Sequence, residues 1–415
     1  MSKENMNYIG ISAGFHDAAL SVVGDGKILF AGHGERYTGV KCDKESECDS
    51  FVKNTLYKPF KLPIQYLPES DIHPLSETVN QDLELVKSVG SKSVYQQLFK
   101  PTHNFGEMMI NEWEKQFTTN IQYLLDTQQV IREMNYIPKC DVKHDLLMTI
   151  WDDVKRNSDE FLEKYCYIEW DIIKSLNHSS GFLQVLSMIN MMSPVISLML
   201  PVLFLVLPFI ILKIRGLQIT AKMYIDVLRD IAKHHFIGKI INGLSSLSIE
   251  NLIYLVLVSG FYFFQIYQNI ISCKRFYQNM VQMRQYLYEI KTYLGNSIQT
   301  MEHFINRHCE KESYTTFCAD IRKHIHSIKE YLKLLILIEP PTTNLVYDIG
   351  NIGYMSQCYY ELHSNKQFDE SIRYSFGFEG FMDNLRGINS HYNSGYVSPA
   401  IFDTTRSCEF KKQYY

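Results

Sequence analysis

The chain has 415 residues, of which 46% are hydrophobic and 21% charged, and its formal net charge is -4 at pH 7. A chain of this length and apolar content can bury the cores of two or three domains, which excludes a largely disordered protein. The small net charge excludes a globally basic nucleic-acid-binding protein, so any contact with DNA would have to come from a local patch or a partner.

Cysteine usage and the N-terminal residues indicate the compartment. The nine cysteines lack the tight, paired spacing of a disulfide framework, which favours reduced thiols. The first ten residues, MSKENMNYIG, have no apolar stretch and no small-residue cleavage site, so they do not have the pattern of a secretory signal. We expect a protein that is membrane-associated or cytoplasmic, and not secreted.

Residues 1–41 have the pattern of a small β element. Three short β-prone runs between residues 8 and 31 alternate with glycine turns, and Gly24-Asp25-Gly26 is typical of a hairpin. Residues 42–79 differ, because acidic residues and four prolines interrupt any regular element. The sequence predicts a Pro-rich linker over this second stretch.

From residue 80 the pattern is helical almost to the end, since apolar residues recur three or four positions apart. The predicted fold class is therefore mainly α, with long lever-like or core-like helices beside the small N-terminal β element. The expected parts are a helical domain over 80–190, an apolar helical hairpin over 191–273, a lever-like region over 274–395 and the start of a further domain over 396–415. The expected helices cover residues 83–99, 105–134, 146–176, 249–294, 314–338 and 344–362.

Two uncharged runs, residues 191–212 and 251–273, are each long enough to cross a bilayer as a helix, which takes roughly 20 residues. They predict a two-helix membrane hairpin. Pro194, Pro201 and Pro208 argue against it, because each removes a helical hydrogen bond, and membrane helices tolerate this only where neighbours satisfy the freed carbonyls. The alternative is a hydrophobic hairpin buried in a large helical domain or an oligomer interface.

The connector between the two apolar runs is basic. Six basic residues outnumber two acidic ones between residues 213 and 239. A basic amphipathic helix beside apolar runs favours a membrane surface, DNA phosphates are the other expected target, and an ordinary solvated face is the alternative. The predicted basic surface for DNA or lipid comprises Lys213, Arg215, Lys222, Arg229, Lys233 and Lys239.

The N-terminal segment carries a resemblance. Gly10-Ile11-Ser12, His16-Asp17, the turn at Asp25-Gly26 and Glu35-Arg36-Tyr37-Thr38 resemble the opening of carbamoyltransferases of the antibiotic and nodulation type. The resemblance implies an actin-like ATPase fold in which the first hairpin helps to hold a phosphate-bearing ligand, with His16 and Asp17 near the phosphate. It covers about residues 8–41, and the paired-histidine metal signature of the family is absent, so the alternative is a β-hairpin remnant packed on the helical body.

A second resemblance covers about residues 80–415. SVYQQLFKPTHNFGEMMINEWEKQ, the proline-rich run ending PFIILKIRG, and YSFGFEGFMDNLRGI resemble the region before the ATPase in divergent MutS-like mismatch-repair proteins of large DNA viruses. The resemblance implies a helical core and lever that couple DNA recognition to a C-terminal ATPase. No G-x-x-x-x-G-K-[ST] motif occurs in the chain, so ATP and Mg²⁺ are implied only for a C-terminal domain that is missing here.

The remaining candidate motifs predict no catalytic or metal site. His303, His308, Cys309, Cys318, His324 and His326 lack a second tight ligand pair of the kind that zinc needs, so we expect no metal ligand among them. Histidines near polar residues elsewhere do not establish a Ser/His/Asp set. We therefore expect no cofactor in this chain, and not a complete enzyme.

The function favoured by the sequence is a non-catalytic helical scaffold that resembles the pre-ATPase core of a MutS-like protein. The expected partners are DNA, a membrane, a second copy bound through the long helices and a separate ATPase subunit. The alternatives are a membrane-anchored interaction protein without a DNA role, and a remnant carbamoyltransferase.

Overall fold

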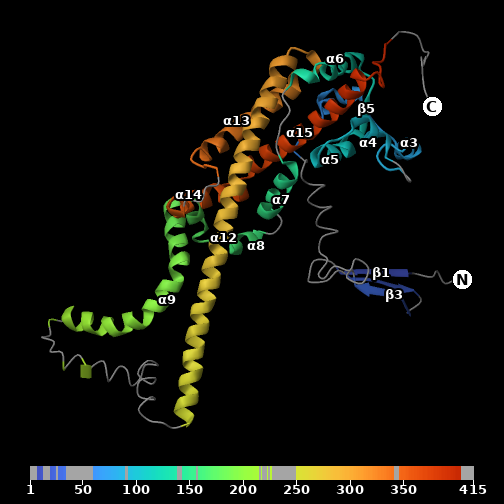
Figure 1. Cartoon of the computed structure of the whole chain (residues 1–415). Coiled ribbons are helices and arrows are strands. Elements are labelled where there is room, and N and C mark those ends of the chain that lie inside the picture. The colour runs from blue at the N-terminus through green and yellow to red at the C-terminus, as the bar shows by residue number, and fades with distance from the viewer. Residues whose placement is uncertain are drawn as a thin grey trace. The chain divides into compact units, whose positions relative to one another are not determined.

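The computed structural model describes residues 59–88, 92–137, 143–155, 158–214, 249–340 and 345–402, four positions of the connector, and the backbone of three strands near the N-terminus. Helices dominate, as predicted (Figure 1). The three strands, β1 (Asn7–Ser12), β2 (Ala19–Gly24) and β3 (Lys27–His33), form an antiparallel sheet in that order. The predicted β element is confirmed, and it has three strands.

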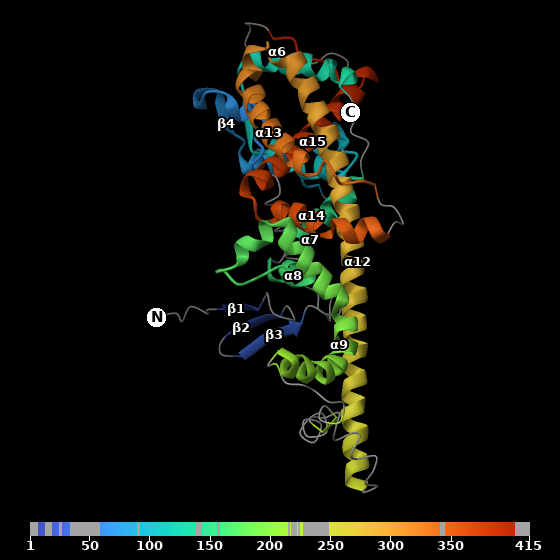
Figure 2. The same ribbon diagram turned by 90° about the vertical axis from the view of Figure 1, so that its left-hand side faces the viewer.

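The chain divides into two compact units that are each assembled from separate segments. We name residues 1–152, 292–333 and 366–415 the core unit, and residues 153–291 and 334–365 the hairpin unit. One helix, α12 (Ile249–His308), is 60 residues long and supplies both units. At 1.5 Å per residue it extends for about 90 Å, and Figure 2 shows it as one unbroken rod.

The core unit is helical apart from the N-terminal sheet and one short strand pair, β4 (Ile72–Pro74) with β5 (Gln116–Thr118). α15 (Lys366–Asn393) is its central helix, and almost every side chain between Ser371 and Leu385 is buried. Phe304, Phe317 and Phe381 pack edge to face around it. The helices of this unit are α3 (Glu77–Asp82), α4 (Val94–Phe99), α5 (Asn104–Trp113), α6 (Ile121–Arg132), most of α7 (His144–Lys155), the end of α12, α13 (Thr315–Leu334) and α15 (Lys366–Asn393).

Glycines let the backbones of α15 and its neighbours approach closely. A Cβ at Gly387 would lie 1.6 Å from the carbonyl oxygen of Phe99, and one at Gly380 would lie 2.4 Å from that of Phe105. Neither distance is physically allowed for a real Cβ, so these positions require glycine as long as α4 and α5 keep their places.

Several predicted boundaries differ from the observed ones. Of the expected helix over 83–99 the described residues contain only α4, because Ser93 caps a new helix there, and the expected helix over 105–134 is interrupted by β5 before Asn120 caps α6. The one over 146–176 divides into α7, α8 (Ser158–Lys164) and a 3-10 turn. Within the stretch interpreted as a linker, Phe60 is buried and packs on Tyr374 and Phe381.

The hairpin unit contains α8, α9 (Ser180–Ile214), the first part of α12, and α14 (Leu345–Ser364). α14 holds the start of α9, because Gln184 donates to the carbonyl of Ile349 and accepts from the amide of Gly353. The half-buried carboxylate of Asp153, near the end of α7, joins the residue that follows α8 to α14, because it accepts hydrogen bonds from the hydroxyls of Tyr165 and Tyr359. This part of the unit is an ordinary packed core, in contrast to the helical extension described next.

Candidate functional site

α9 and the first part of α12 run antiparallel and touch along a polar seam. The Cys273 thiol donates to the carbonyl of Met191 at 3.3 Å, and the Tyr262 hydroxyl donates to the carbonyl of Ser197 at 3.3 Å. The Asn269 amide also bonds the Ser197 hydroxyl. Figure 1 shows α9 beside α12 before it bends away, and these contacts form the predicted hairpin.

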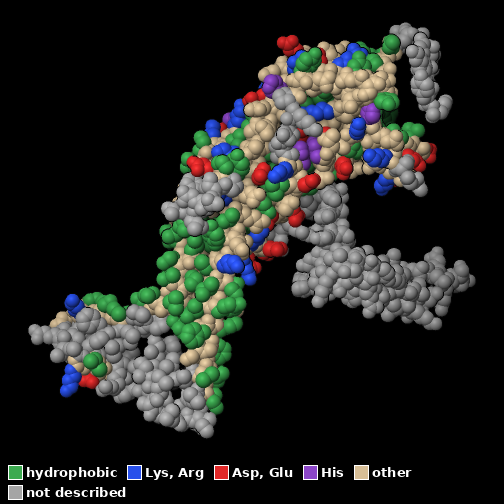
Figure 3. Space-filling model, in the orientation of Figure 1, with side chains coloured by type: hydrophobic (Ala, Val, Ile, Leu, Met, Phe, Trp, Pro, Cys, Tyr) green, Lys and Arg blue, Asp and Glu red, His purple; other side chains and the backbone are tan. Residues whose placement is uncertain are grey.

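The outer faces of these two helices are apolar and exposed. Val256, Phe261 and Phe263 on α12 are 60%, 73% and 67% exposed, and large apolar side chains of α9 from Val185 to Ile214 are about half-exposed at the described positions. Half-exposure of one Leu or Phe leaves roughly 80–100 Å² of apolar surface in water, so ten such side chains exceed the roughly 300–600 Å² patch of a typical soluble monomer. Figure 3 shows this continuous apolar band along both helices.

One of the three prolines of α9 has its freed carbonyl satisfied by the neighbouring helix. Pro201 has no N–H, so the carbonyl of Ser197, four residues earlier, lacks its helical donor. The Tyr262 hydroxyl occupies that acceptor from the neighbouring helix. The arrangement places Ser197, Tyr262 and Asn269 between the helices and many large apolar side chains outside, although Gln265 and Gln268 are also exposed. Polar contacts between helices with apolar side chains outside are typical of helices that pack in hydrocarbon.

Among the described helices, one segment is long and apolar enough to cross a membrane, Ser180–Leu200. Only 11% of its most apolar stretch is buried. It shares residues 191–200 with the run predicted at 191–212. On α12 the uncharged run from residue 251 to 273 extends for about 33 Å, close to the roughly 30 Å of a hydrocarbon core.

Of the predicted basic surface, Lys213 is exposed in the last turn of α9 and Lys222 is exposed and helical. Arg215, Arg229, Lys233 and Lys239 lie outside the described residues, as do His16 and Asp17 of the predicted phosphate site. Both predictions therefore rest on the sequence alone.

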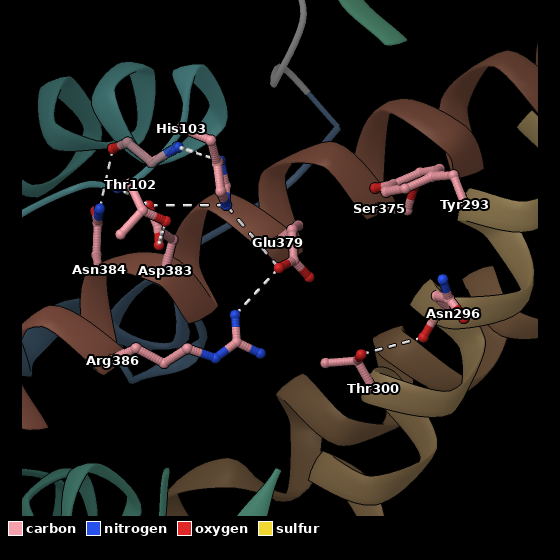
Figure 4. Close-up of polar contacts among 11 residues, drawn as sticks. Thr102, His103, Tyr293, Asn296, Thr300, Ser375, Glu379, Asp383, Asn384 and Arg386 are labelled. Carbon is pink, nitrogen blue, oxygen red and sulfur yellow. Dashed lines mark hydrogen bonds and ion pairs between the residues drawn. The ribbon is translucent and has the colours of Figure 1, made fainter. Parts of the chain in front are cut away.

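A buried polar cluster in the core unit was not anticipated from the sequence (Figure 4). Glu379 and Asp383 lie one turn apart on α15 and are each 1% exposed. Asp383 accepts from the amide and the hydroxyl of Thr102, both at 2.7 Å, and Glu379 pairs with Arg386 at 3.1 Å. The His103 ring faces both carboxylates, with Nε2 3.7 Å from Asp383 and 4.0 Å from Glu379.

His103, His144 and Glu379 bring three potential metal-ligand atoms within 4.8 Å of one another. Their geometry does not fit one ion. The two imidazole rings are stacked 3.7 Å apart at an interplanar angle of 10°, and a metal must lie in the plane of each ring that binds it, so no nearby point serves both. His103 Nδ1 also accepts the Gly106 N–H at the start of α5, which places the proton of a neutral ring on Nε2, the nitrogen that faces the carboxylates.

The cluster instead ties the turn before α5 to α15. The residues that it contributes from the turn before α5 lie more than 270 positions from those on α15, so no local sequence motif predicts the cluster. The histidines singled out in the sequence do not form a second cluster of this kind among the described residues: His303 and His326 are exposed, whereas His308 and His324 point into the core. Burial lowers the pKa of both buried histidines, that of His308 to about 4.

No family model, curated protein or solved structure matches the chain.

Proposed function

We propose that the chain is a membrane-anchored helical scaffold, in which α9 and the first part of α12 insert into a bilayer and the core unit carries interactions in the adjacent aqueous phase. The observation that carries the proposal is the inverted hairpin, with Ser197, Tyr262 and Asn269 bonded between the helices and apolar side chains outside. In hydrocarbon, polar groups must bond to one another within the protein, and exposed apolar side chains such as Phe261 and Phe263 contact lipid at no cost. In water neither arrangement is favoured.

The experiment is membrane retention of the full chain after an alkaline carbonate wash. The wild-type chain should stay in the membrane pellet. Val256→Glu combined with Phe263→Glu adds two carboxylates at the lipid-facing positions and should release the chain, since a charge at the bilayer centre costs about 2.5–3.5 kcal/mol.

The matched control is Leu83→Glu combined with Ile121→Glu, because these side chains are 55% and 51% exposed in the core unit, outside the hairpin. This control should be retained like the wild type. A wild-type chain that washes off and runs as a soluble, monodisperse species would overturn the proposal, and the hairpin would then be a protein interface.

A second candidate is the pre-ATPase scaffold of a MutS-like protein, with DNA, a second copy and a separate ATPase subunit as partners. It is favoured by the unbroken 60-residue α12, which supplies both compact units as a lever would. Fluorescence anisotropy with matched and mismatched duplexes tests it. Tighter binding to the mismatched duplex supports this role. Equal binding to the two duplexes, or no binding to either, would exclude the role and leave the membrane-anchor proposal unaffected.

A further inference from the structure

The apolar part of α12 ends abruptly at two basic residues. Lys274 and Arg275 follow directly on the uncharged run of residues 251–273, and both are exposed. Ile253 and Lys274 are 21 residues apart, or about 32 Å along the helix, so a bilayer that covers the apolar run brings both charges to its headgroup layer.

The two basic residues continue the lipid-facing stripes of the helix. Lys274 lies seven and four residues after Tyr267 and Ile270, which are 58% and 53% exposed, so at about 100° per residue the three share one face. Arg275, about 100° further around the helix, lies eleven residues after the exposed Phe264 and seven after the exposed Gln268, so these three share a neighbouring stripe. The opposite side of this segment is occupied by protein, because Phe276 is buried and Cys273 bonds the carbonyl of Met191 on α9.

Lys274 and Arg275 are therefore displayed toward lipid and not toward α9. A lysine at the end of a lipid-facing stripe lays its alkyl stem along apolar neighbours and extends its ammonium to the headgroups. Phosphate oxygens of anionic phospholipids are the ligands that an ammonium and a guanidinium recognise at that depth.

We propose that Lys274 and Arg275 form a collar that binds the headgroups of anionic phospholipids where the hairpin leaves the bilayer. The collar rests on the proposed membrane anchor and adds lipid selectivity to it.

The test reconstitutes the full chain in nanodiscs of equal phosphatidylcholine and phosphatidylglycerol, re-extracts it gently and quantifies the retained lipids by mass spectrometry. The wild type should retain phosphatidylglycerol above its bulk share. Because each basic residue near an anionic surface contributes about a fivefold preference, Lys274→Gln combined with Arg275→Gln should lower the ratio of retained phosphatidylglycerol to retained phosphatidylcholine at least about fivefold. Salt at about 0.5 M should lower it in the wild type as well.

The matched control is Lys87→Gln combined with Lys92→Gln, which removes the same charge from exposed positions of the core unit and should leave the enrichment unchanged. Equal enrichment in the Lys274/Arg275 double variant would overturn the collar. A wild type that resists carbonate but shows no enrichment would overturn the collar while leaving the anchor intact. Release of the wild type by carbonate would overturn both.

Discussion

Replacing Tyr262 by phenylalanine removes the hydroxyl that satisfies the carbonyl freed by Pro201, and it changes nothing else in the shape of the seam. Hydrogen bonds between membrane helices contribute about 0.6 kcal/mol on average and up to about 1.7 kcal/mol. The acceptor at Ser197 has no helical donor, so we expect Tyr262→Phe to cost more than that average, about 1 kcal/mol of hairpin stability.

The companion change is Pro201→Ala, which restores an N–H that can donate to the Ser197 carbonyl within α9. In that background the carbonyl no longer depends on Tyr262, so Tyr262→Phe should cost less than about 0.3 kcal/mol. The difference between the two backgrounds is the coupling energy, and the structural account requires it to be about 0.7 kcal/mol or more.

The assay is unfolding of the full chain in mixed micelles by increasing SDS, followed by the helical circular dichroism signal. Tyr267→Phe is the control, because that side chain is 58% exposed on the same helix and its loss of a hydroxyl should have little effect. An equal cost of Tyr262→Phe in the wild-type background and in the Pro201→Ala background would refute the reasoning.

Three further predictions concern the core unit. Gly387→Ala should destabilise it by about 2–3 kcal/mol in urea unfolding, because the new Cβ meets the Phe99 carbonyl. The control is Gly295→Ala on α12, which should be neutral or stabilising by up to about 1 kcal/mol, because a Cβ there would have nothing within 4 Å. Burial lowers the pKa of His308 to about 4 in the folded state, whereas in the unfolded chain this histidine takes up a proton near pH 6.5. The free energy of unfolding should therefore fall by up to about 3 kcal/mol as the pH drops from 6.5 to 4. His308→Gln should flatten that dependence in pH-dependent urea titrations. Asp383→Ala should cost about 3 kcal/mol in the same assay, since it removes two hydrogen bonds from Thr102 to a buried carboxylate and the carboxylate that His103 faces, and adding Zn²⁺ should not raise the stability of the wild type.

The sequence was informative where one physical signal dominates a long stretch. Uncharged runs at 191–212 and 251–273 predicted the two helices of the hairpin, and both lie within observed helices. Alternating β-prone residues and glycine turns likewise predicted the N-terminal strands. α12 was expected to end at residue 294, yet it continues to His308 because Gly295 lies in open space on a long helix and is tolerated there.

Contacts between residues that are distant in the sequence were beyond prediction. Tyr262 and Ser197 are 65 residues apart, and Thr102 and Asp383 are 281 apart, so neither pair leaves a local pattern. Phe60 was placed in a linker because prolines surround it, although a proline-rich segment can lie in extended form across a core and bury an aromatic ring. The partition into two interleaved units follows from these same long-range contacts.

The central claim is that the outer face of the hairpin contacts lipid, and photocrosslinking tests it most directly. Replacing Phe263 by p-benzoylphenylalanine places a photoreactive side chain on that face, in the full chain in liposomes that contain a labelled phospholipid. We expect a lipid adduct from position 263 and none from the same substitution at Leu83, which is exposed in the core unit. Crosslinks from position 263 to protein alone, with no labelled lipid, would contradict the account.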